Sequence, residues 1–364
     1  MASVAVVVAL GFAYAPSAPL APSAPCASPR IGFLGPITGN AAFIGKEQLG
    51  FARYAIRKLG GGKVKLIEGD TQFKPARAAT VATKFHANRD VLAVVGPAGS
   101  QEVLAVAPIF KQARQLPFIS GSAVHPSLTN GSIPNFFRVV PNDSVQSPTI
   151  AKHIRVALKA RDVVIVDDRS AYSRGLANAV QKNLKARGVR VTRRSVSQKV
   201  TDFSALVAKI GLTVDVVFLP WQIAASAQLF GQQLQEQGKQ AVIFGSDALD
   251  SGDFRIPGSY VSAFAPDIRG IEGNAAFIKG YGGTFVSNFG PPMYVATQAA
   301  VAAIRKACAD GDATRAEVHK NLKATFIPKI VLGGNLRFTA RGDRKGATFS
   351  IFKLGAGGKK AMAG

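Results

Sequence analysis

The sequence has few of the residues that build metal centres or covalent scaffolds. Its 364 residues include only two cysteines and four histidines. Two cysteines are too few for a disulfide framework or a cysteine-rich zinc site. The histidines are scattered and lack the spacing of metal ligands: His86, His125, His153 and His319. We therefore expect no metal centre.

Long apolar runs and acidic residues are also scarce. No apolar run reaches the roughly 18 residues that a membrane-spanning helix needs, which excludes a polytopic membrane protein. Hydrophobic residues make up 47% and charged residues 18%, as in a globular chain. At roughly 150 residues per domain, the length predicts about two domains.

The charge balance is strongly basic, with 45 Lys and Arg against 21 Asp and Glu, a net +24. The densest basic clusters, residues 190–194 and 341–345, lack the interleaved aromatics of nucleic-acid stacking platforms. No helix-turn-helix or zinc-finger pattern occurs. We expect no nucleic-acid partner, and interpret the Lys and Arg residues as solvated surface.

Signatures of catalysis are missing. The turn after the first expected strand reads Gly35-Pro36-Ile37-Thr38-Gly39-Asn40, which lacks the glycine spacing of a dinucleotide site. Gly60-Gly61-Gly62-Lys63 precedes a strand and does not open a helix, so it is no phosphate loop. No G-x-S-x-G or H-E-x-x-H motif occurs. We expect neither an enzyme nor a bound cofactor.

The first 29 residues carry no charge and resemble an export leader. Residues 4–14 are apolar, and Ala13-Tyr14-Ala15 has the form of a cleavage site, with residues 24–27 as a rival. Cys26 raises lipid anchoring as an alternative, although Ser23-Ala24-Pro25 is a poor lipobox. A low-complexity tail on a cytosolic protein also fits. Removal of residues 1–29 would leave Cys308 alone, so we expect no intrachain disulfide.

From residue 30 onward, short β-branched runs alternate with amphipathic segments. This alternation is typical of βαβ units with buried parallel strands, and it predicts two doubly wound α/β lobes. The expected strands are 31–34, 64–68, 92–95, 118–120, 163–167, 190–195, 214–219, 241–245 and 260–264. The expected helices are 48–59, 75–87, 102–115, 144–159, 176–187, 203–210, 224–237 and 294–309. Residues 136–143 are interpreted as a crossover between the lobes, and residues 355–364 as a frayed tail.

Short motifs follow the expected strands in a fixed order. They are Gly35-Pro36-Ile37-Thr38-Gly39, Glu68-Gly69-Asp70-Thr71, Gly96-Pro97-Ala98-Gly99-Ser100, Ser120-Gly121-Ser122-Ala123, Phe137-Arg138, Tyr172-Ser173-Arg174-Gly175 and Phe244-Gly245-Ser246-Asp247. This ordered set resembles the type I periplasmic substrate-binding proteins of branched-chain amino-acid ABC importers, the Leu/Ile/Val-binding family. The resemblance runs from about residue 30 to residue 353.

The resemblance implies two Rossmann-like lobes joined by three crossovers, with ligand in the cleft. Lobe 1 would comprise residues 30–140 and 266–336, and lobe 2 residues 141–265 and 337–354. Residues 1–29 would be the leader and residues 355–364 a flexible tail. In open α/β sheets, ligands bind beyond the carboxyl ends of the strands, which is where these motifs fall.

The resemblance also implies a carboxylate site in lobe 1. Ser100, Ser122, Ala123 and Val124 follow strand ends, where backbone N–H groups and a hydroxyl suit a ligand carboxylate. The family commonly has Thr or Ser at the position of Val124, whose side chain cannot hydrogen-bond. Ile44 stands where some members carry an aromatic residue, and the cysteine pair of some members is missing.

Lobe 2 supplies the remaining candidates. Asp247 would pair with a ligand ammonium, through a charge-assisted bond roughly twice as strong as a neutral one. Tyr172 would offer a ring and a hydroxyl. Trp221 and Gln222 are candidates for the pocket of the ligand side chain. Helix capping and core packing are the structural alternatives for these residues.

These observations predict an exported, monomeric, non-enzymatic protein that captures a small polar solute and delivers it to the membrane permease of an ABC importer. An aliphatic, branched-chain amino acid is favoured; an amide, urea or an aromatic carboxylate stays open. Ligand would act by hinge closure, because it contacts both lobes only when they close. A cytosolic ligand-sensing regulator of the same fold is the second hypothesis, and a Rossmann-type enzyme the third.

Overall fold

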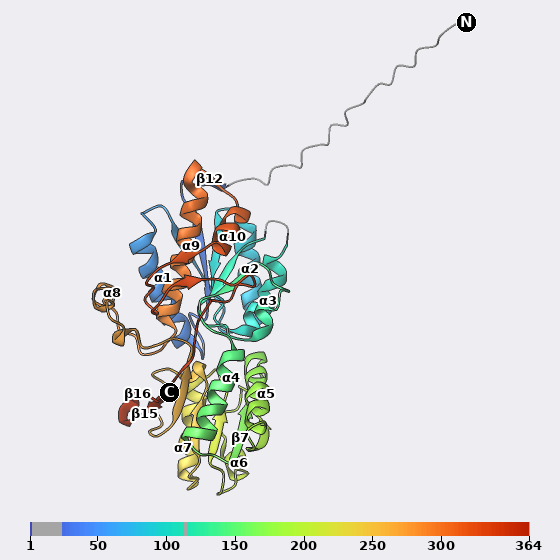
Figure 1. Ribbon diagram of the computed structural model, residues 1–364, viewed down its shortest axis with the longest axis vertical. Coiled ribbons are helices and arrows are strands. Elements are labelled where there is room, and N and C mark those ends of the chain that lie inside the picture. The colour runs from blue at the N-terminus through green and yellow to red at the C-terminus, as the bar shows by residue number, and fades with distance from the viewer. Residues whose placement is uncertain (2–23, 113–114, 364) are drawn as a thin grey trace.

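A computed structural model describes residue 1 and residues 24–112 and 115–363 (Figure 1). Two sheets lie one above the other, each flanked by helices. We call the five-stranded sheet with its helices the first lobe, and the seven-stranded sheet with its helices the second lobe. Among the described residues, none of the helices combines the length and apolar character needed to cross a bilayer.

The first lobe contains a parallel sheet of order β3-β2-β4-β5-β6. Its core strands are apolar and buried, as a sheet covered on both faces requires. The strands are β2 Arg30–Gly35, β3 Lys65–Asp70, β4 Val91–Val95, β5 Phe118–Ser120 and β6 Phe136–Arg138. Helices α1 Ala42–Leu59, α9 Gly290–Ala307 and α10 Arg315–Lys323 pack on one face. Helices α2 Pro75–Ala87 and α3 Ser100–Phe110 pack on the other.

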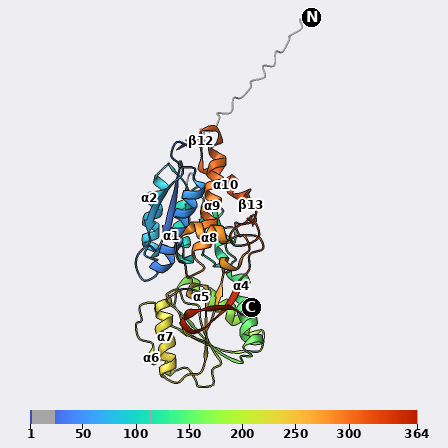
Figure 2. The same ribbon diagram turned by 90° about the vertical axis from the view of Figure 1, so that its left-hand side faces the viewer.

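The second lobe contains a mixed sheet of order β16-β15-β11-β10-β9-β7-β8. The strands are β7 Asp162–Asp167, β8 Arg190–Ser195, β9 Val216–Leu219, β10 Val242–Gly245, β11 Tyr260–Ala263, β15 Ser350–Leu354 and β16 Lys360–Met362. β15 and β16 are antiparallel to their neighbours. Helices α4 Asp143–Lys152 and α5 Ala171–Lys185 cover one face, and α6 Ser204–Ala208 and α7 Ala224–Glu236 the other (Figure 2).

The remaining elements are short. They are β1 Ala24–Pro25, α8 Ala275–Tyr281, β12 Asp312–Ala313, β13 Phe326–Ile327 and β14 Leu336–Arg337. The main chain passes between the lobes after β6, after β11 and between β14 and β15. We propose residues 30–140 with 266–336, and 141–265 with 337–354, as the two lobes.

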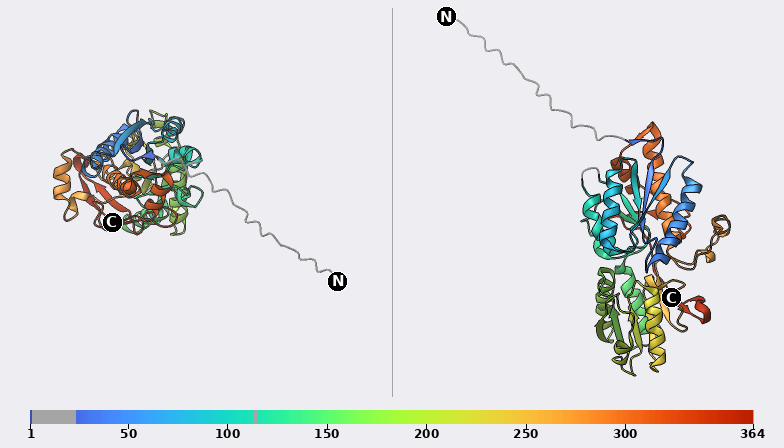
Figure 3. Two further views of the ribbon diagram at one scale, coloured as in Figure 1. Left: turned by 90° about the horizontal axis from the view of Figure 1, so that it is seen from above. Right: turned by 180° about the vertical axis from the view of Figure 1, so that it is seen from behind.

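The doubly wound α/β fold expected from the sequence is confirmed. Each expected strand and helix forms, three of them with the expected bounds (75–87, 118–120 and 190–195) and the others with shifted ends. Two expectations were wrong. Residues 136–138 are not only a crossover: the buried Phe136 and Phe137 pair with β5 as a sixth strand in chain order. Residues 360–362 are not frayed, because they pair with β15 as the edge strand of the second lobe's sheet (Figure 3).

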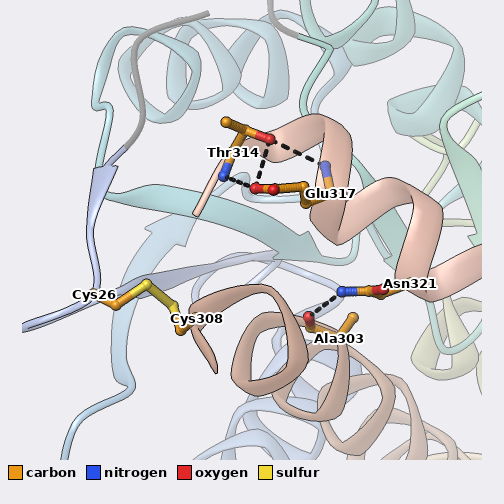
Figure 4. Close-up of a disulfide and its surroundings, with 6 residues drawn as sticks. All are labelled: Cys26, Ala303, Cys308, Thr314, Glu317 and Asn321. Carbon is orange, nitrogen blue, oxygen red and sulfur yellow. Dashed lines mark hydrogen bonds between the residues drawn. A yellow bond between two sulfur atoms is a disulfide. The ribbon is translucent and has the colours of Figure 1, made fainter. Parts of the chain in front are cut away.

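A disulfide joins Cys26 to Cys308 across 282 residues of sequence, so the expectation of no intrachain disulfide was also wrong (Figure 4). Cys26 belongs to the folded unit: β1 pairs with β12, and the Cys26 N–H donates to the Gly311 carbonyl at 2.9 Å. The Cα atoms of the two cysteines lie 5.6 Å apart, within the normal range. A thiol used in this bond is not available for lipid attachment.

Loss of the disulfide should destabilise the protein by about 2–4 kcal/mol, because the bond restricts the unfolded chain. We expect reductant to lower the melting temperature of the wild-type protein in scanning calorimetry. A Cys26→Ser/Cys308→Ser double variant should have the melting temperature of the reduced protein, and reductant should not change it. Equal melting temperatures for the oxidised and reduced wild type would contradict the pairing.

Candidate ligand-binding cleft

The first wall of the cleft is a turn after β5. The Ser120 hydroxyl organises this turn by accepting the N–H groups of Ser122 at 3.2 Å and Ala123 at 2.9 Å. The Ser122 hydroxyl donates to the Ala98 carbonyl and accepts from the Gln48 amide, both at 2.9 Å. Among the described residues, the N–H of Val124 donates no hydrogen bond, so we interpret it as the group available to a ligand.

Ser100 lies beside this turn as the first residue of α3 and is 1% exposed. Its hydroxyl oxygen accepts the His125 N–H at 3.3 Å, so the β4 and β5 turns are linked. The helix is capped by Gly99, whose N–H donates to the Glu102 carboxylate at 2.9 Å. Ser100 is therefore not the helix cap, and its hydroxyl proton is free to donate toward the cleft.

The opposite wall is built around Asp247, which follows β10 and is 2% exposed. The Tyr172 hydroxyl donates to its Oδ1 at 2.7 Å. The Gln146 amide donates to the same oxygen and to the Ser262 hydroxyl. Tyr172 is the second residue of α5 and Gln146 lies in α4, so two helices of the second lobe fix this carboxylate.

Asp143 was not predicted as a site residue. It is the first residue of α4 and is fully buried, and both carboxylate oxygens lack a hydrogen-bond partner within the described part of the chain. Its N–H donates to the Val124 carbonyl at 2.9 Å. The first turn of α4 therefore places a carboxylate between the Val124 turn and Asp247.

The electrostatics of the cleft favour a cation. Burial raises the pKa of Asp247 to about 6, against the lowering effect of hydrogen bonds from Tyr172 and Gln146. Burial, and then repulsion from Asp247, raise the pKa of Asp143 well above its usual value, while Arg138 opposes the shift. Burial also raises the pKa of Tyr172, so its phenol keeps its proton. An ammonium beside the two carboxylates would offset their desolvation.

Trp221 and Gln222 differ in their surroundings. The Trp221 indole donates to the Val166 carbonyl at 2.6 Å and packs against Phe203 and Phe230 in the core of the second lobe. It also lines a small cavity together with Asp168, Gln198, Phe203 and Ile223. The Gln222 amide exchanges two hydrogen bonds with Gln101 of the first lobe, at 3.2 and 3.3 Å.

Other contacts between the lobes show that the cleft is closed. A Cβ atom added to Gly175 of α5 would lie 2.6 Å from two ring atoms of His125, which belongs to the first lobe. Phe43 of α1 packs against the core of the second lobe. The chain thus brings Ser100, Val124, Tyr172 and Asp247 close together where the two lobes meet. No group of three or more His, Cys, Asp or Glu side chains able to hold a metal occurs among the described residues.

Two doubly wound lobes, three connections and a buried polar cluster between them define a two-lobed solute-binding protein. The sequence matches the family model described as "Periplasmic binding protein" over residues 28–359. The chain belongs to this family, whose members bind substrates.

Curated relatives match along nearly the whole chain. "Leu/Ile/Val-binding protein homolog 1" of Brucella abortus (strain 2308) is 30% identical over 342 residues, covering 89% of this chain and 90% of the relative. "Leu/Ile/Val-binding protein BraC3" of Rhizobium johnstonii is 28% identical over 348 residues, covering 90% and 92%.

Solved structures share the fold. The leucine-binding protein LivK of Thermotoga maritima superposes with a TM-score of 0.84 at 20% identity, covering 92% of this chain and 98% of that one. LivJ of Streptococcus pneumoniae in complex with isoleucine gives 0.83 at 24% identity, with the same coverage. A solute-binding protein of R. palustris in complex with benzoate gives 0.80 at 19% identity, covering 93% and 96%.

The raised pKa of Asp247 predicts a pH dependence of stability. Between pH 3.8 and about 6 the folded state holds a proton that the unfolded state has released, so the free energy of unfolding falls as pH rises through this window. Two pKa units correspond to roughly 3 kcal/mol. In urea denaturation of the ligand-free protein, the free energy of unfolding should fall less between pH 4 and pH 7 for Asp247→Asn than for the wild type. Equal losses would contradict the shift.

Proposed function

We propose that this protein is an extracytoplasmic binding protein that captures an aliphatic amino acid, with Leu, Ile and Val favoured, for an ABC importer. One observation carries the proposal. The Val124 carbonyl bonds to the Asp143 N–H, so a turn with a free N–H lies directly beside two buried carboxylates. An α-amino acid carries its carboxylate and ammonium on adjacent atoms, which suits this juxtaposition. The names of the Brucella and Rhizobium relatives, and the isoleucine bound to LivJ, support the same ligand class.

Each candidate residue has a role in this proposal. The Ser100 hydroxyl and the N–H groups of the Ser122–Val124 turn bind the ligand carboxylate, Val124 through its backbone alone. Asp247 binds the ammonium, with Asp143 as a second carboxylate, and Tyr172 orients Asp247. Gln222, which reaches the first lobe, contributes to the wall that meets the ligand side chain, and Trp221 supports this wall from the core of the second lobe. The protein carries out no chemical step on its ligand and acts as a monomer.

Hinge closure provides the mechanism. The ligand carboxylate accepts hydrogen bonds from the first lobe, and the ligand ammonium contacts the acidic side chains of the second lobe. The ligand therefore stabilises the closed state to the extent that it binds this state more tightly than the open one. The Gln101–Gln222 amide pair and the contact of Gly175 with His125 form only when the lobes meet. A permease would then recognise the closed shape.

Export is part of the same proposal. A disulfide supports an oxidising compartment, since such bonds are rare in the cytosol. The leader would be cleaved so that Cys26 is retained, which argues against cleavage after Ala27. The disulfide also argues against the alternative of a cytosolic ligand-sensing regulator.

An aromatic carboxylate is the second candidate, favoured by the R. palustris structure with benzoate. Val124 lacks the hydroxyl expected of the amino-acid binders, which is compatible with a different ligand. However, an anion without an ammonium would bring no positive charge to Asp247, and it would leave Arg138 as the nearby positive charge for Asp143. The two buried carboxylates therefore favour the amino acid.

The ligand class is tested by calorimetric titration with leucine, isoleucine, valine and benzoate. We expect the aliphatic amino acids to bind and Asp247→Ala to weaken them at least 100-fold, because one partner of the ammonium is lost. Asp253→Ala, at an exposed aspartate six positions later, is the matched control and should bind as the wild type does. Binding of benzoate alone would replace the amino-acid class, and binding of none of the four would overturn the proposal.

Closure is tested by Gly175→Ala. The added Cβ would meet the His125 ring, which is held by a 2.8 Å hydrogen bond to the Ser127 hydroxyl, so the closed state should be disfavoured. We expect at least tenfold weaker leucine binding and no ligand-induced compaction in small-angle X-ray scattering. In the control Gly231→Ala, the new Cβ meets Ile256 within the second lobe, so compaction should persist. Normal compaction in Gly175→Ala would refute this role.

A further inference from the structure

Arg138 is a fully buried cation directly behind the carboxylate-binding turn. It ends β6 and is 0% exposed. One terminal nitrogen of its guanidinium donates to the carbonyls of Ala123 at 3.1 Å and His125 at 3.0 Å. The other donates to the Thr129 hydroxyl, and Nε donates to Asp343. Two of its hydrogen bonds therefore hold the carbonyls of the residues on either side of Val124.

The geometry of the peptide group gives the first bond a specific effect. The Ala123 carbonyl and the Val124 N–H belong to one planar trans peptide, so they point in opposite directions. Holding the carbonyl on Arg138 makes the Val124 N–H point away from Arg138. This N–H is the one that the turn leaves unused. The bond to His125 fixes the other end of the turn, where Pro126 begins a short 3-10 helix.

Asp343 extends the same cluster to the connections between the lobes. Its second carboxylate oxygen accepts from the Thr129 hydroxyl at 3.0 Å and from the Asn142 amide at 3.4 Å. Asn142 caps α4 in the first connection, and Asp343 lies in the third. The backbone completes the link, because the Arg138 N–H donates to the Gly342 carbonyl at 2.9 Å.

We propose that Arg138, together with Asp343, is a positioning residue that orients the Val124 N–H toward the ligand carboxylate and couples this turn to two of the three connections between the lobes. The proposal rests on the proposed function for the identity of the ligand. A ligand that shifts the turn therefore also shifts the connections between the lobes, because the Arg138 guanidinium is bonded to both. The buried positive charge also favours an anionic group on the far side of the turn.

Lysine cannot replace arginine in this role. The planar guanidinium serves the turn carbonyls, Thr129 and Asp343 from three nitrogens at once, whereas a lysine ammonium is a single point donor. Asp343 is more accessible, with 24% of its side chain exposed, so Asp343→Asn is the milder variant if Arg138→Lys fails to fold. Asparagine keeps the shape but removes the charge that holds the guanidinium.

Arg315 offers a matched control in the same lobe. It is a buried arginine whose guanidinium also donates to backbone carbonyls, those of Val91 at 2.9 Å and Asn88 at 2.7 Å. The Val91 carbonyl lies at the start of β4 and the Asn88 carbonyl at the end of α2, so both are at the opposite end of the strands from the proposed ligand site. Arg315→Lys therefore reports the cost of losing a buried guanidinium without touching the turn or the hinge.

The experiment compares leucine with leucinamide, which keeps the ammonium but lacks the carboxylate. We expect Arg138→Lys and Asp343→Asn to weaken leucine at least tenfold and leucinamide less, so that the ratio of the two Kd values shrinks. Arg315→Lys should keep the wild-type ratio. An unchanged ratio in both cleft-side variants, or equal weakening of the two ligands, would overturn the proposal.

A second readout does not depend on the ligand. Hydrogen exchange of the ligand-free protein should be at least tenfold faster at the amides of residues 122–125 in Arg138→Lys and Asp343→Asn, and unchanged there in Arg315→Lys. Unchanged exchange in both cleft-side variants would refute the positioning role even if leucinamide binds too weakly to measure. If the wild type binds no amino acid, the proposed function fails, while the exchange rates still decide the role of Arg138.

Discussion

Two buried carboxylates between the lobes are the constraint on which the rest of the structure depends. Asp143 and Asp247 repel each other and are removed from water, which disfavours the charged form of both. The second lobe supplies hydrogen bonds from Tyr172 and Gln146 to Asp247, whereas neither carboxylate oxygen of Asp143 has a hydrogen-bond partner in the part of the chain that the structure describes. Such a site is unfavourable when empty, and a cationic group on the ligand relieves it. In the proposed function, this buried negative charge is what selects a ligand with a cationic group.

Much of this arrangement could be predicted from the sequence, because parallel strands buried on both faces give short apolar runs and because ligand sites follow strand ends. Ser100, Val124, Tyr172 and Asp247 were predicted as site residues in this way. Asp143 was not, since an acid after Asn142 resembles an ordinary helix start. Gln48, Gln101 and Gln146 gave no signal either: an amide acquires its role only from the partner that tertiary structure brings to it.

The same limit explains the errors. Cys26 lies in a segment whose composition resembles a leader, and nothing local relates it to Cys308. The strand at Phe136–Arg138 is three residues long, and a following proline made it resemble a connection. Lys359 and Lys360 give the start of β16 a polar sequence that resembles a frayed tail. The backbone of β16 nevertheless pairs with β15, and the Lys360 ammonium donates to the Val286 carbonyl at 2.9 Å. In each case a long-range contact overrides the local pattern.

The disulfide has a topological consequence. It closes a covalent ring from Cys26 to Cys308, and every strand of the second lobe except β15 and β16 lies inside that ring. The chain leaves the first lobe after β6, builds most of the second lobe and returns before the ring closes. A single cut by a protease in any loop of that stretch would therefore leave one molecule, with both cut ends still tethered. The loops of both lobes between Cys26 and Cys308 therefore share this protection from fragmentation.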